Sequence, residues 1–167
     1  GIALLVDREL IIGVGAPGAV SLTQASAAGT AAELRYGRPG TCVPPVVGGT
    51  VVVGDTADGS LSLGPQTVVS NTDNAVSQGV VIGRSAGVTG TVAISNASWN
   101  DTGAQFIIGD EGHALIEITD GGRLFTNVCT QAGGEGVVLA RGPDSSATVT
   151  VSGVDSLWRI TGGSTSL

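Results

Sequence analysis

A three-part pattern recurs along the chain and constrains its fold more than any other feature. Each copy has an apolar run that ends at a small residue, then a run in which apolar and small polar residues alternate, then a short segment with a large apolar residue. Three copies are clear, at 80–99, 106–125 and 137–158, and weaker copies begin at residues 51 and 10. A self-similar unit of about 20 to 50 residues is typical of a stacked repeat architecture.

The units consist of strand-like segments separated by turn residues. The alternation at 91–95, 115–118 and 148–152 is the period-2 pattern of a half-buried strand. The clusters of Gly, Asp, Asn and Ser between these segments are typical of turns. Three strands and three corners per unit predict an all-β fold, a right-handed parallel β-helix of about five coils with three short strands per coil.

The domain organisation follows from where the pattern is regular. We predict a single β-helix over 1–167, in which 1–50 form an irregular first coil and 51–167 form regular coils. Residues 1–9 are interpreted as the end of a preceding coil. We therefore expect this chain to be a piece of a longer protein.

The long insertion at 23–50 breaks the repeat. Residues 30–33 have the form of a capping box, and Gly37 lies where a helix would end, so the sequence predicts a short helix here. Two roles for the insertion stay open. It either protrudes to contact a partner, as loops on rigid scaffolds do, or covers the side of the coils.

Charge and composition restrict the partners. The 167 residues carry a net charge of −7, and all seven basic residues are arginine. Nucleic acid and anionic lipid need a basic face, so we exclude both. No stretch reaches the roughly 18 apolar residues of a membrane helix, so we expect no membrane insertion by this chain. The 28 glycines and 3% aromatic residues favour a narrow aliphatic core.

Cys42 and Cys129 are the two cysteines. Three coils separate them, which is roughly 14 Å along the axis at the spacing of paired strands. A disulfide needs Cα atoms within about 7 Å. We therefore expect two unpaired, mostly buried thiols, unless the insertion folds a long way along the coils.

Catalytic and metal-binding patterns are sparse. His113 is the single histidine, between Gly112 and Ala114 at a predicted corner, and we interpret it as a solvated turn residue. The chain has no Gly-x-Ser-x-Gly nucleophile elbow and no CxxC or HxxxH spacing. We expect no catalytic residue, no metal site and no cofactor.

Carboxylates need a separate argument, because polysaccharide-cleaving proteins work with paired acids. The candidates are Asp55, Asp58, Asp110, Glu111, Glu117 and Asp120. One predicted column, at the corner after the first strand of each unit, alternates in sign. It contains Asp55, Arg84, Asp110 and Arg141. Exposed neighbours of opposite charge contribute about 0 to 1 kcal/mol per pair, so the column predicts a structural ladder rather than an acid–base pair.

The large apolar residues of the third segments align as a second column. It contains Val69, Trp99, Phe125 and Trp158. If the rings are exposed, Trp99, Phe125 and Trp158 form a stripe that could stack on sugars, and they are the candidate ligand-binding residues. The alternative is that the rings pack on one another and seal a corner of the coil.

The phrases at 88–100 and 147–158 resemble the passenger repeats of bacterial autotransporter proteins, the type V secretion family, and 106–125 is similar to a sister phrase with a Gly-Gly turn. The resemblance implies a β-helical passenger that is exported across the outer membrane and acts as an adhesin or aggregation factor. It implies no fixed functional residues.

These observations predict a non-enzymatic β-helical passenger fragment of a secreted or surface-exposed bacterial adhesin. Its expected partners are a host surface protein, a glycan or further copies of itself, because open coil ends expose unpaired strand edges. The alternative is a glycan-binding or glycan-cleaving β-helix of the polysaccharide lyase or phage tail-spike type. That alternative requires acids that converge beside Trp99.

Overall fold

The computed structural model describes residues 3–6, 9–23, 31–36, 50–71, 78–102, 105–127, 136–162 and 165–166. Within these ranges the chain is all-β, and its strands form three sheets in which every pair of neighbouring strands is parallel. None of the described segments is a helix that could cross a membrane.

Each sheet takes one strand from every coil. The first sheet, A, contains β1 (Ala3–Val6), β4 (Ala32–Tyr36), β7 (Thr67–Asn71), β10 (Ser98–Asp101), β13 (Arg123–Asn127) and β16 (Leu157–Thr161). Sheet B contains β2 (Glu9–Ile12), β5 (Thr50–Val53), β8 (Gln78–Ile82), β11 (Gln105–Ile108), β14 (Gly136–Leu139) and β17 (Thr165–Ser166). Sheet C contains β3 (Gly18–Leu22), β6 (Gly59–Leu63), β9 (Thr89–Ser95), β12 (His113–Thr119) and β15 (Ser146–Val151).

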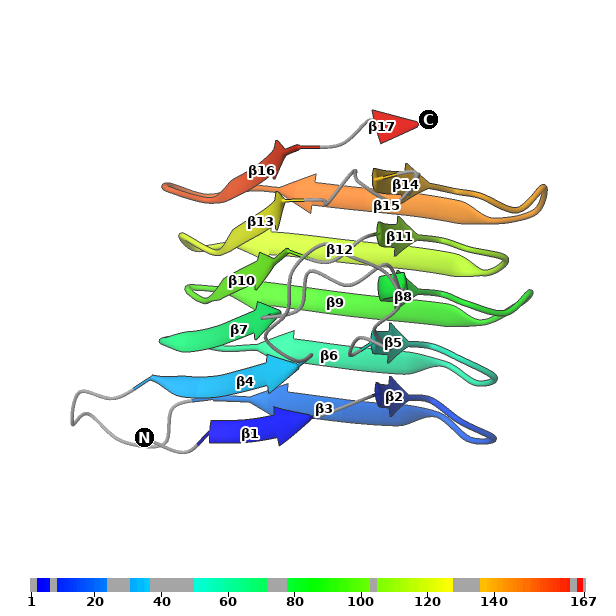
Figure 1. Cartoon of the computed structure of the whole chain (residues 1–167), viewed down its shortest axis with the longest axis horizontal. Coiled ribbons are helices and arrows are strands. Elements are labelled where there is room, and N and C mark those ends of the chain that lie inside the picture. Colours follow the sequence, from blue (N-terminus) through cyan, green and yellow to red (C-terminus); the bar gives the residue numbers. More distant parts are fainter. Residues whose placement is uncertain are drawn as a thin grey trace.

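The chain visits sheets B, C and A in turn, so each coil has three strands and five such coils run from β2–β3–β4 to β14–β15–β16. Figure 1 shows the coils stacked on one another, with β1 and β17 at opposite ends. The predicted parallel β-helix is confirmed. β1 pairs with β4 and occupies the third-strand place of a preceding coil, which confirms the sequence-based interpretation for residues 3–6, whereas Glu9 already begins β2.

Inward side chains of successive coils form columns. In sheet C, Leu61, Val92 and Ile116 stand in register and all are 0% exposed. Alternate residues of these strands face outward, which explains the period-2 pattern. Sheet B differs, because a second buried cluster lies on its other face, formed by Val52, Val81, Ile107 and Val138. Burial on both faces explains why these strands are continuous apolar runs.

The small residue that ends each apolar run is required by the corner. Gly54, Gly83 and Gly109 follow β5, β8 and β11 with φ of 78°, 68° and 76°, and Ala140 holds this place after β14 with φ of 53°. A Cβ at Gly83 would collide with the backbone oxygen of His113 in the next coil. Positive φ and close backbone approach both favour glycine.

The helix predicted within the insertion is wrong where the structure describes it. Residues 32–36 form strand β4, which pairs with β1 on one side and β7 on the other. Leu34 and Tyr36 are buried while Arg35 is exposed, so the segment alternates with period 2. Packing in the sheet outweighs the weak local helix signal. Thr30, Gly37, Cys42 and Cys129 lie outside the described residues, and the predicted thiol state stays a prediction.

Candidate functional site

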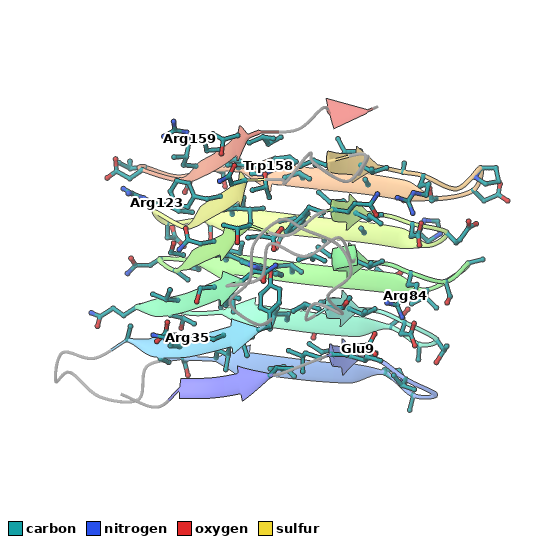
Figure 2. All side chains as sticks on the ribbon, viewed as in Figure 1. Glu9, Arg35, Arg84, Arg123, Trp158 and Arg159 are labelled. Carbon is teal, nitrogen blue, oxygen red and sulfur yellow. The ribbon has the colours of Figure 1, made fainter. Side chains whose placement is uncertain are left out.

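The predicted pairing of opposite charges at the corner between sheets B and C is confirmed for two neighbouring pairs of the column, Asp55 with Arg84 and Asp110 with Arg141. Arg84 Nη1 donates to Asp55 Oδ1 at 3.1 Å, and Arg84 Nη2 lies 3.6 Å from Glu9 Oε1. Arg141 Nη1 donates to Asp110 Oδ1 at 3.3 Å. Figure 2 shows Arg84 and Glu9 at this corner. These side chains are partly exposed, so each pair contributes about 0 to 1 kcal/mol.

The remaining candidate acids are spread over different corners and faces. Asp58 Oδ1 accepts from the backbone N–H of Thr89 at 2.7 Å, and Asp120 Oδ2 accepts from Ser95 Oγ at 3.1 Å. Glu117 is exposed on the outer face of sheet C, and Glu111 is exposed beside Asp110. Glycosidic cleavage uses two carboxyl groups that flank one bond. None of the six candidate acids faces inward or toward Trp99, because each lies at a corner or on an outward face of a sheet.

His113 is exposed at the start of β12, as predicted for a turn residue, and its Nδ1 lies 2.9 Å from Ser146 Oγ. A Ser–His–Asp triad also needs a carboxylate on the imidazole. Within the described ranges no hydrogen bond joins His113 to one, and no group of three or more His, Cys, Asp or Glu residues could hold a metal ion.

Of the two arrangements left open for the aromatic column, Trp99, Phe125 and Trp158 do not form the exposed stripe. Trp99 is 0% exposed and packs edge-on against Tyr36 and Phe106, with ring centroids 6.5 and 5.7 Å apart. Trp99 stands in register with Val69 and Leu124, and Leu124 with Trp158. These residues form an inward column that Phe125 does not join.

Phe125 belongs to the opposite face of the sheet. It stands in register with Asn100 and Arg159, one residue beyond the inward column, and it is partly exposed. Because side chains alternate along a strand, a one-residue difference moves a ring from the core to the outside. Aligning the aromatic residues with one another therefore misplaced Phe125, since Leu124 takes the inward position.

A buried polar cluster, which the sequence analysis did not predict, lies where the strands of sheet A end. The Tyr36 hydroxyl donates to Asp101 Oδ1 at 2.8 Å, and Asn71 Nδ2 donates to the same oxygen at 2.9 Å. Trp99 Nε1 donates to the Tyr36 hydroxyl oxygen at 3.0 Å. Burial, followed by the negative charge of Asp101, raises the pKa of Tyr36 well above its ordinary value. These bonds satisfy polar groups inside the core.

A periodic signal for this cluster exists in the sequence. The last inward position of each sheet A strand is two residues beyond the large apolar residue, and it is polar or aromatic in four successive coils. These residues are Tyr36, Asn71, Asp101 and Thr126, and all are 5% exposed or less. The residue two positions after each member of the inward column therefore predicts the buried polar cluster.

The last coil exposes its inward residues. Val151 and Ile160 are 44% and 37% exposed, whereas Ile118 and Thr126, their partners in register one coil earlier, are both 0% exposed. β15 and β16 each have only one neighbouring strand among the described residues. This end of the stack therefore presents apolar side chains beside unpaired backbone N–H and C=O groups.

The described side chains thus offer a surface charge ladder, a buried polar cluster and an open apolar end. No family model, curated protein or solved structure matches this chain.

Proposed function

We propose that this chain is a non-enzymatic β-helical passenger segment of a secreted or surface-exposed bacterial adhesin, and that it acts by self-association and adhesion. Its partners are further copies of itself and a host surface protein or glycan. Support for the passenger role comes from the repeated phrase of the sequence, which resembles passenger repeats, and from the regular stacking of five three-strand coils.

The observation that carries self-association is the set of exposed apolar side chains on β15 and β16 of this 167-residue chain. Val151 stands in the inward column of sheet C, but almost half of its surface is exposed. Apolar surface gains about 25 cal/mol for each Å² removed from water. The free edges of β15 and β16 can pair with further strands by backbone hydrogen bonds. A second copy stacked on this end would cover the exposed apolar side chains and pair with the free strand edges. In a longer protein a following coil would take the place of the second copy.

Sedimentation velocity over a range of concentrations tests this proposal. We expect the wild-type chain to associate as its concentration rises. Val151→Asp places a charge where association would bury it, and we expect association to weaken at least about tenfold, or 1.4 kcal/mol. Thr148→Asp is the matched control, because Thr148 lies on the same strand, is exposed and outward-facing, and stands in register with the uncharged Leu115. A wild-type chain that stays monomeric, or equal effects of the two substitutions, would refute the proposal.

A further inference from the structure

The arginines of this acidic chain divide into two groups. Three of the described arginines form ion pairs, namely Arg35 with Glu33 at 2.6 Å, Arg84 with Asp55 and Arg141 with Asp110. Arg123 and Arg159 have neither an ion pair nor a side-chain hydrogen bond with any residue that the structure describes. In a chain of net charge −7, two exposed guanidinium groups with no described partner are the groups most available to an anionic ligand.

Both groups lie on the outer face of sheet A. Arg123 begins β13 and Arg159 lies in the adjacent strand β16. Their neighbours Leu124 and Trp158 occupy the inward column, so both arginines face outward, and both are exposed. The register pairs Arg123 with Leu157, which places the Cα atoms of the two arginines about 8 Å apart at ordinary strand spacing. Figure 2 shows them on the same side of the stack.

Phe125 lies between the two cations. It stands two residues beyond Arg123 on β13 and directly in register with Arg159 on β16. Its ring is partly exposed, which leaves an apolar surface beside two positive charges. Asn100 stands on the other side of Phe125 in the same row and adds an amide, 3.5 Å from Ser98 Oγ.

The face is also hollowed next to Arg123. A shallow depression of about 240 Å³ lies where sheet A meets the preceding corner. Its walls include Val68, Ser98 and Arg123, with Asn96 and Gln66 at the corner. Cation, hydroxyl and amide groups therefore border a recess on the same outer face as the row of Asn100, Phe125 and Arg159.

We propose that this face, which comprises Ser98, Asn100, Arg123, Phe125 and Arg159, binds an anionic glycan through carboxylate or sulfate groups. The planar guanidinium matches these groups and forms two parallel hydrogen bonds with them. The ring of Phe125 offers its face to the apolar side of a pyranose, and the amide and hydroxyl accept and donate to sugar hydroxyls. This proposal specifies a ligand for the adhesive role proposed above, and it rests on that role.

The charge pattern favours a sparsely charged glycan over nucleic acid. Among the described residues, this face offers two arginines without an ion pair, and Asp120 and Asp155 lie at the corner that precedes β13 and β16. A nucleic acid carries a phosphate on every nucleotide and needs a continuous basic face. A strand-like acidic peptide would need a free sheet edge. β10 and β13 are paired on both sides, and the free edge of β16 is the surface already proposed for self-association.

Binding to defined oligosaccharides tests the site. The probes are a uronic-acid tetrasaccharide, a neutral tetrasaccharide of similar size, a poly-glutamate peptide and single-stranded DNA, each measured by biolayer interferometry at two salt concentrations. We expect the uronate to bind and the neutral sugar not to bind, with weaker uronate binding at high salt. Arg123→Gln with Arg159→Gln should lower uronate affinity at least about tenfold.

Arg35→Gln is the matched control, because Arg35 is an exposed arginine on the outer face of the same sheet but is paired with Glu33. We expect this variant to bind within about twofold of wild type. Circular dichroism spectra and melting temperatures of all variants confirm that the fold is retained. Absence of uronate binding, equal losses in the two variants, or equal or tighter binding of the peptide or DNA would overturn the site. If uronate binding fails while Val151→Asp still weakens association, the end-to-end function stands without this ligand.

Discussion

Tyr36 makes the buried polar cluster testable, because one oxygen atom takes part in two of its hydrogen bonds. Tyr36→Phe removes the donor to Asp101 Oδ1, 2.8 Å away, and the acceptor of Trp99 Nε1, 3.0 Å away. A hydrogen bond to a carboxylate contributes about 1.5 to 3 kcal/mol, and a buried donor left without an acceptor costs about 1 to 3 kcal/mol. Removing the hydroxyl also removes its own desolvation cost. We expect a net loss of about 3 kcal/mol in the free energy of unfolding.

Urea unfolding followed by tryptophan fluorescence measures this loss, since Trp99 is part of the cluster. Arg35→Gln is the control, because Arg35 is the preceding residue on β4 and its pair with Glu33 lies at the surface. We expect no resolvable change in the free energy of unfolding for this variant, because the pair is fully solvated. Asp101→Asn, alone and combined with Tyr36→Phe, completes a double-mutant cycle whose coupling energy isolates the contact. A loss below about 0.5 kcal/mol for Tyr36→Phe, or a coupling energy near zero, would refute the proposed role of the hydroxyl.

Two further predictions follow from single residues. Burial holds the pKa of Tyr36 in the folded chain well above 10.0. The unfolded chain therefore loses the phenol proton at a lower pH than the folded chain does. The free energy of unfolding falls as the pH rises beyond about 10, and the contribution of Tyr36 is fully retained below that pH. Unfolding measured from pH 8 to 11.5 should show this decline in wild type and a flatter curve in Tyr36→Phe; parallel curves would contradict the assignment. Gly83→Ala should lower stability by about 3 kcal/mol, because a Cβ there meets the backbone of His113. Gly87→Ala shares the positive φ but meets nothing within 4 Å, so thermal melts should show a loss of about 1 kcal/mol from the backbone conformation alone. Equal losses for the two variants would argue against the collision.

Much of the coil architecture could be read from the sequence because its determinants are local. The small residue at the end of each sheet B run is demanded by a positive φ at one position, as at Gly54 and Gly109. The alternation in 91–95 follows from the strand itself. The charge ladder was also predictable, because Asp55 and Arg84 occupy the same place relative to that small residue in successive coils.

The errors arose where local signals compete with packing. The segment at 32–36 has a possible helix start before it, yet Leu34 and Tyr36 are drawn into the core as parts of two inward columns. Phe125 was placed by its similarity to Trp99, although the turn before β13 brings Leu124 into that column. Both errors concern which face a side chain occupies, and the neighbouring coils decide that.

The sequence by itself determined that the chain forms three-strand coils, because period-2 alternation and positive-φ corners act within a few residues. Only the tertiary structure decided which residues stand side by side, because register depends on turns of unequal length between strands of different coils. Tyr36 and Asp101 are 65 residues apart and share one hydrogen bond. Arg123 and Arg159 are distinguished from the paired arginines only by what lies within reach of their side chains. The stacking of coils, more than any motif, therefore places the polar cluster in the core and the cationic, partly aromatic face on the outside.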